Sequence, residues 1–227
     1  MATKGDFGRI YFPGNPWPKG HQIVECCWSG RIERSTGVWF DFHIVSEAFD
    51  AADKGRRFPD EDGNLGPTES RALWCNHRHM ILSTTNWPGL AYGFHAGSRE
   101  EPFDYRKLSG RVFQVDNPPI SEGYPRPLAV YRWGHEHVAY SAVAFKKESG
   151  SKTFSISWSG QVGGFSHGSP DFPYQFNMKL KKVTFAGIHL PVHVERSDAF
   201  ALAEPYVRDS RKYKFLRRKN DAVLIPQ

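Results

Sequence analysis

Several of the ten histidines stand two residues apart, in segments where polar and apolar side chains alternate. Cys75, His77 and His79 have this spacing, and His135 and His137 repeat it. In an extended chain, residues two apart project from the same side, with Cβ atoms ~7 Å apart. Imidazole binds zinc, iron and copper, and a metal-bound water can act as a nucleophile. If the fold brings the two pairs together, His77, His79, His135 and His137 are candidate ligands of a divalent metal cofactor.

The simpler explanation is that these histidines hydrogen-bond across a sheet or face solvent. No further ligand stands at a fixed spacing from either pair, and Cys75 is typical of a small buried residue. The sequence also has no Gly-x-Ser-x-Gly elbow and no Walker loop. No spacing singles out two carboxylates as a catalytic pair for glycoside hydrolysis. A metal-dependent enzyme with a histidine-lined site is therefore the alternative hypothesis for function.

Aromatic residues favour a different class of function. The chain has 17 Phe, 9 Tyr and 7 Trp, and most of these rings are expected in the core. Trp17, Trp87 and Trp133 stand next to proline or glycine, where exposure is more common than in mid-strand. Exposed rings can stack on sugars or apolar ligands. We therefore predict a non-catalytic binding or interaction protein with an aromatic-lined pocket or face, whose partner is a small molecule, a sugar or a protein.

The net charge of +6 comes from one segment. Residues 208–219 hold seven basic residues and one acidic residue, which leaves 23 of each in the rest of the chain. A short basic run is more typical of a solvated strand or tail than of a nucleic-acid surface. We therefore expect an all-β domain over 1–207, a basic C-terminal strand or tail over 208–227, and no nucleic-acid partner.

The three cysteines are not expected to form a disulfide framework, because their number is odd and Cys26 and Cys27 are adjacent. Two adjacent thiols on one strand point to opposite faces. The N-terminal residues contain no apolar signal region, and no apolar run approaches the ~18 residues that span a membrane. These features predict a cytoplasmic protein with no membrane partner.

The elements that position these residues are mostly strands. In 37–45, Val38, Phe40, Phe42 and Ile44 fall on one face. The other face carries Trp39, Asp41, His43 and Val45. Similar segments are separated by Gly, Pro, Asn and Asp. We predict strands near 9–12, 21–28, 37–45, 71–83, 90–95, 111–115, 128–133, 136–146, 152–159, 174–180, 182–190 and 192–196. Basic and aromatic residues alternate again near 213–216.

Two short helices are predicted, over 46–53 with Ser46 as cap and over 197–204 with Ser197 or Asp198 as cap. Many short strands with hairpin-length connections predict an all-β fold, a single-domain antiparallel β-sandwich or closed barrel with one or two short helices. The predicted core comprises Ile23, Phe40, Phe42, Ile44, Ile81, Val112, Val130, Val143, Phe154, Ile156, Phe176 and Phe185.

Overall fold

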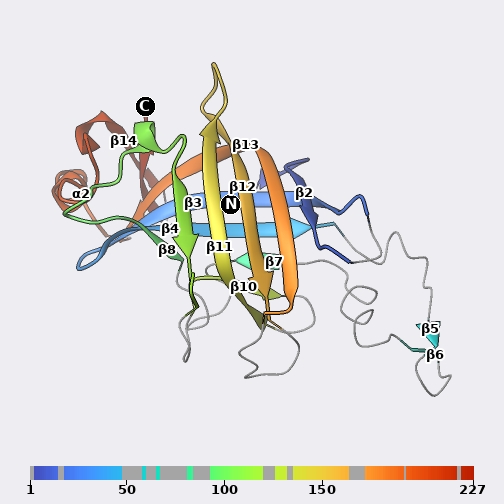
Figure 1. Ribbon diagram of the computed structural model, residues 1–227. Helices are drawn as coiled ribbons and strands as arrows, with labels where there is room; N and C mark the ends of the chain where they lie inside the picture. Colours follow the sequence, from blue (N-terminus) through green and yellow to red (C-terminus); the bar gives the residue numbers. More distant parts are fainter. Residues whose placement is uncertain are drawn as a thin grey trace.

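A computed structural model gives the arrangement of the chain (Figure 1). It describes residues 3–14, 18–47, 58–59, 65–66, 81–83, 93–119, 126–131, 135–163, 172–191, 193–218 and 221–227.

Thirteen of the described strands form one hydrogen-bonded sheet, and two more form a separate pair. The sheet contains β1 (Thr3–Lys4), β2 (Gly8–Tyr11), β3 (His21–Glu33), β4 (Gly37–Ser46), β7 (Ile81–Ser83), β8 (Phe94–Gly97), β9 (Val112–Val115), β10 (Ala129–Tyr131), β11 (His135–Lys147), β12 (Thr153–Val162), β13 (Tyr174–Leu190), β14 (Tyr213–Arg218) and β15 (Asp221–Pro226). The separate pair is β5 (Phe58–Pro59) with β6 (Leu65–Gly66). The described helices are α2 (Arg196–Ala203) and the 3-10 turns η2 (Tyr105–Lys107) and η3 (Ser210–Lys212).

The strand pairings close on themselves. Going round from β3, the order is β2, β13, β12, β11, β10, β7 and β4, which pairs with β3 again. All of these pairings are antiparallel, and an additional parallel pairing joins β13 to β3. The predicted all-β, mainly antiparallel fold is therefore confirmed, and of the two predicted forms the pairings describe a closed barrel.

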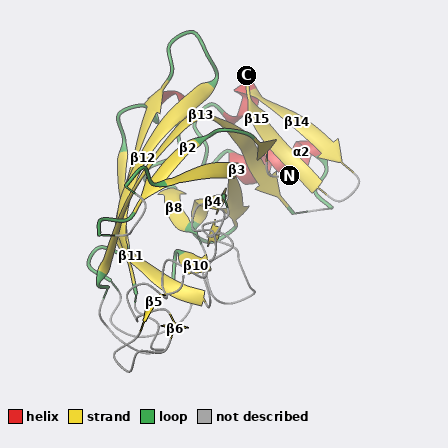
Figure 2. Ribbon diagram, turned by 90° about the vertical axis from the view of Figure 1, so that its right-hand side faces the viewer, coloured by secondary structure: helices red, strands yellow, loops and turns green. Residues whose placement is uncertain are grey.

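Two layers of strands cross each other in this barrel. β11, β12 and β13 form the front layer in Figure 1, and β3 and β4 run across behind them. β13 reaches both layers, because its first half pairs with β12 and β2 and its second half pairs with β3 and β15. Lys182, with φ of 55°, interrupts the β12–β13 register where β13 turns between layers. Figure 2 shows α2, β14 and β15 on the other side of the molecule from β11 and β12.

The inward faces of the strands form the core. One buried row crosses six strands in register: Phe113, Val143, Trp158, Met178, Ile10 and His21. Trp28 on β3 lies between the two layers and is fully buried. Five phenylalanine rings lie with their centroids 4.7–6.0 Å from the Trp28 ring: Phe40, Phe42, Phe145, Phe154 and Phe185. The high aromatic content therefore fills the barrel with rings that contact each other mainly edge-on or tilted.

Most of the predicted core is buried, including the inward face of 37–45 and both predicted residues of β12. Ile81 is only half-buried, and the prediction for Val112 is wrong because its side chain is 54% exposed. Val112 alternates with Phe113, which occupies the inward position on β9. Cys26 is buried and Cys27 is half-buried on the other face of β3, as predicted for adjacent residues of one strand, and both thiols are free.

Several boundaries differ from the predictions. The segments 174–180 and 182–190 are the two halves of one strand, β13. Of the strand predicted over 192–196, the described residues 193–196 are not a strand, because a turn at His193 leads into α2. The residue that caps α2 is Glu195, without a side-chain cap bond, instead of Ser197 or Asp198. Ser46 ends β4, and the rest of the helix predicted over 46–53 lies outside the described residues except for Glu47, which is not helical. Residues 208–227 contain η3, β14 and β15, and β15 pairs with β13.

His21, at the end of the buried row, makes stability depend on pH. Burial lowers the pKa of His21 to about 4, and the Arg9 guanidinium contributes to this shift. An unfolded histidine titrates near 6.5, so between these pH values the unfolded chain binds more protons and stability falls as the pH falls. We expect the free energy of unfolding to be about 2 kcal/mol lower at pH 5 than at pH 7.5 through this residue. Urea denaturation at both pH values should show the loss, and a His21→Gln variant should lack most of it. An equal pH dependence in both proteins would contradict this assignment.

Candidate functional site

Most of the residues that the sequence predicts to bind a small molecule or a metal lie outside the described part of the chain. This holds for Trp17, Trp87 and Trp133. It also holds for His77, His79 and the side chain of His135, whereas His137 is half-buried on β11. Among the described residues, no group of three His, Cys, Asp or Glu side chains is placed to hold a metal ion. The histidine site and its metal therefore stay a hypothesis.

The outward face of β3 and β4 brings other reactive side chains together. Cys27 pairs with His43 across the strands, and Asp41 lies on the same face as His43, as predicted. Asp41 accepts a hydrogen bond from Arg31 at 2.5 Å. Burial raises the pKa of the Cys27 thiol, and the Asp41 carboxylate adds to that shift. A nucleophilic cysteine requires the thiolate, so this environment opposes nucleophilic catalysis by Cys27.

The C-terminal elements form an arrangement that is more favourable for binding a ligand. Their local structure follows from the sequence. α2 is rich in alanine, and Ala199 and Ala203, one turn apart, are buried against the barrel. The helix ends at Ala203, and its C-cap residue Glu204 stands directly before Pro205. The chain then runs beside Phe103, whose N–H donates to Tyr206 O at 2.8 Å while its carbonyl accepts from Arg208 N at 2.9 Å.

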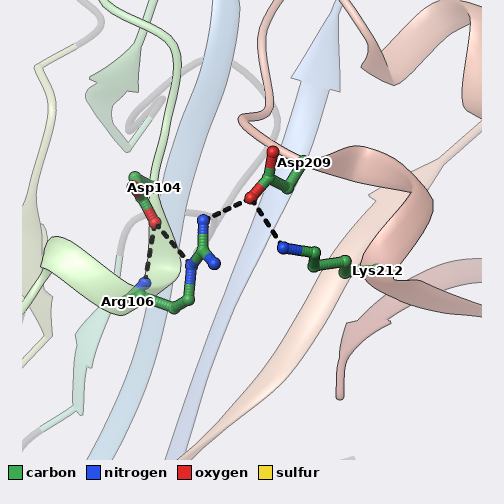
Figure 3. Close-up of polar contacts among 4 residues, drawn as sticks. All are labelled: Asp104, Arg106, Asp209 and Lys212. Atoms are coloured by element: carbon green, nitrogen blue, oxygen red, sulfur yellow. Dashed lines mark hydrogen bonds and ion pairs between the residues drawn. The ribbon is translucent and has the colours of Figure 1, made fainter.

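Charged side chains add to this attachment (Figure 3). The buried Asp104 accepts a hydrogen bond from the backbone N–H of Arg106 at 3.0 Å. The Arg106 guanidinium donates to Asp209, and Lys212 Nζ lies 3.2 Å from the same Asp209 oxygen. These hydrogen bonds lower the pKa of the Asp209 carboxyl, and the bond from Lys212 has a larger effect than the bond from Arg106. Arg106 and Lys212 thereby balance the negative charge of Asp209. The backbone of Asp209 is left-handed and turns the chain into η3.

β14 follows η3 and places aromatic and basic side chains against α2. A groove of about 740 Å³ lies between these two elements, and we call it the α2–β14 groove. Its lining residues are Arg196, Ser197, Phe200, Arg211, Tyr213, Lys214, Phe215 and Gln227. The volume falls within the range of small-molecule sites.

The groove combines rings with positive charge. Tyr213 is buried, and Phe200 and Phe215 are half-buried, so aromatic carbon forms part of its wall. Burial raises the pKa of the Tyr213 phenol, which is therefore neutral at physiological pH. Arg196, Arg211 and Lys214 are exposed cations, and the described lining residues include no aspartate or glutamate.

Little of this positive charge is neutralised by the described residues. Arg211 lies 3.6 Å from Glu204, but both side chains are highly exposed, at 86% and 66%. Such a pair is weak in water. Among the residues that the structure describes, Arg196 and Lys214 form no ion pair. The groove can therefore attract an anionic group and hold an apolar group against its rings.

The sequence contains only part of the signal for this groove. The helix over 197–204 and the basic–aromatic alternation near 213–216 are both recognisable, but neither shows that the two segments lie side by side. Their contact depends on the pairing of β15 with β13, which joins residues more than thirty positions apart.

Comparison with protein-family models, with curated proteins and with solved structures finds no match to this chain. Among the described residues, no helix has the length and apolar character needed to cross a membrane. The functional conclusion therefore depends on the chemistry of the side chains.

Proposed function

We propose that this is a binding protein that takes an organic anion with a flat apolar part into the α2–β14 groove. The observation that carries the proposal is the co-location of three cations, Arg196, Arg211 and Lys214, with the rings of Phe200 and Phe215. A carboxylate, sulfonate or phosphate forms charge-assisted hydrogen bonds with guanidinium and ammonium groups. An aromatic or aliphatic body loses contact with water against the rings.

The groove favours binding over catalysis. Among the described residues of its lining, no histidine, cysteine or carboxylate side chain is present to act as a nucleophile or a general base. A non-catalytic role also agrees with the sequence-based prediction of an aromatic-lined pocket. We further propose a cytoplasmic location, supported by the free thiols of Cys26 and Cys27.

Anilinonaphthalenesulfonate tests the proposal, because it combines an anionic group with fused rings and reports burial by fluorescence. We expect saturable binding that a Lys214→Gln variant weakens about tenfold, the effect of losing one well-placed charge contact. A Phe215→Ala variant should weaken it similarly. Lys146→Gln is the matched control, since it removes an exposed lysine from β11, outside the groove.

Competition identifies which parts of the probe are needed. Naphthalenesulfonate should displace the probe, whereas uncharged naphthol and inorganic sulfate should not do so at the same concentration. Displacement by naphthol as effective as by naphthalenesulfonate, or equal affinity in the Lys214→Gln and wild-type proteins, would exclude a cationic groove as the site.

A further inference from the structure

A second surface, on the opposite side of the barrel, consists of two exposed rows of side chains in register. The first row runs from β9 to β3 through Val112, Ala144, Ser157, Lys179, Arg9 and Gln22. The second row runs from β9 to β2 through Gln114, Ala142, Ser159, Asn177 and Tyr11. We call these two rows together the β-face platform. The buried row that contains Trp158 lies between them on the inward side.

The platform is open and made of short or polar side chains. Ser157, Ser159 and Asn177 are exposed, and Ala142 and Ala144 are half-exposed beside them. Figures 1 and 2 show no described element over the outward face of β11, β12 and β13. The first row crosses six strands, and at ~4.8 Å between strands it spans about 24 Å. An extended chain molecule could therefore lie across it.

One end of the platform is hollowed and positively charged. A cleft of about 570 Å³ contains Arg9 and Lys179 together with Tyr11, Gln22, Ser155 and Ser157. Asp6 is the one carboxylate side chain among the described residues of the cleft. It accepts a hydrogen bond from Lys181 at 2.8 Å, so those two charges offset each other.

The remaining cations of the cleft are available to a ligand. Arg9 is held in place because one of its guanidinium nitrogens donates to the carbonyls of Lys19 and Gly20, each at 3.1 Å. Lys179 is exposed and, within the described part of the chain, forms no ion pair. The cleft therefore offers a guanidinium held in place and an exposed ammonium to one anionic group.

We infer that the β-face platform binds an acidic oligosaccharide, with a carboxylate at Arg9 and Lys179 and neutral hydroxyl groups along the Ser and Asn residues. Serine, asparagine and glutamine side chains both donate and accept hydrogen bonds, as sugar hydroxyls do. Tyr11, which lines the cleft and is 38% exposed, offers a ring for one sugar face. This inference is independent of the α2–β14 groove.

Two other polymers fit the platform less well. A protein partner would require large apolar or aromatic anchors at its centre, where interfaces are depleted in serine, alanine and lysine. A single-stranded nucleic acid would require several stacking rings and cations along its whole path. In the two rows, the only aromatic side chain is that of Tyr11, and the cations gather at one end.

Isothermal titration with tetragalacturonate tests the inference, with uncharged maltotetraose and single-stranded decathymidylate as comparison ligands. We expect tetragalacturonate to bind at least tenfold more tightly than either. Lys179→Gln should weaken its binding about tenfold, as expected for a lost charge-assisted contact. Ser159→Glu should weaken it at least as much by placing a carboxylate in the second row. Lys214→Gln, in the α2–β14 groove, should leave it unchanged.

Circular dichroism of each variant shows whether the barrel is retained. Absence of tetragalacturonate binding, or equal binding by wild type and both platform variants, would overturn the inference. Equal affinity for maltotetraose would overturn the role of the cations, and tighter binding of decathymidylate would replace the sugar by a nucleic acid.

Discussion

Replacing Trp28 with alanine is expected to lower the free energy of unfolding by about 3–5 kcal/mol. The Trp28 side chain is fully buried between the two layers of the barrel, with its ring against five phenylalanine rings. Alanine would leave a cavity that neighbouring rings on separate strands can fill only by leaving their own positions. The stability of a domain of this kind is of the order of 5–15 kcal/mol, so the loss would be a large part of the total.

Urea denaturation followed by far-ultraviolet circular dichroism measures this loss without depending on tryptophan fluorescence. Trp39→Ala is the matched control, because Trp39 lies half-buried on the outward face of β4. The control should cost about 1 kcal/mol, near the centre of the range for single substitutions. Similar losses in the two variants would mean that Trp28 does not occupy the centre of the core.

Replacing Gly37 with alanine should destabilise the protein by at least about 3 kcal/mol, through two separate costs. Gly37 begins β4 with φ of 112°, a conformation that residues with a Cβ rarely adopt. A Cβ at this position would also lie 2.1 Å from the carbonyl oxygen of Gly97. That oxygen belongs to the backbone of β8, which pairs with β4, so relief requires the two strands to move apart.

A Gly110→Ala variant distinguishes the cost of conformational strain from the cost of the close contact. Gly110 has φ of 89°, but a Cβ at this position would meet nothing within 4 Å. Gly110→Ala should therefore cost only the conformational strain, about 1–2 kcal/mol. Thermal and urea unfolding of both variants give the comparison. Equal losses would show that close packing of β4 against β8 contributes nothing at Gly37.

The sequence predicts the strands well where one face is strictly apolar. The alternation in 37–45 identifies β4 and its inward residues. The same argument puts Cys26 and Cys27 on opposite faces, and the structure shows that Cys26 is the inward one. The argument fails at Val112, because Val112, Phe113 and Val115 put apolar side chains on both faces of one short strand. Period-2 patterns cannot select the inward face in that case.

The sites are harder to predict than the strands. The α2–β14 groove depends on a non-local pairing between β15 and β13, and the β-face platform depends on register across six strands. Ser157, Asn177 and Arg9 are unremarkable as single residues, and only strand pairing places them in neighbouring positions. Most of the predicted binding residues belong to segments outside the described residues. These are Trp17, Trp87 and Trp133 for a small molecule, and His77 and His79 for a metal.

Chemical-shift mapping gives the most direct test of the proposed binding function. Backbone amide proton–nitrogen correlation spectra of the full chain would be recorded during titration with naphthalenesulfonate. We predict saturable shifts that cluster at residues 196–200 and 211–215, the two sides of the α2–β14 groove. Saturable shifts confined to other parts of the barrel, or no shifts at a concentration that displaces anilinonaphthalenesulfonate, would contradict the proposal.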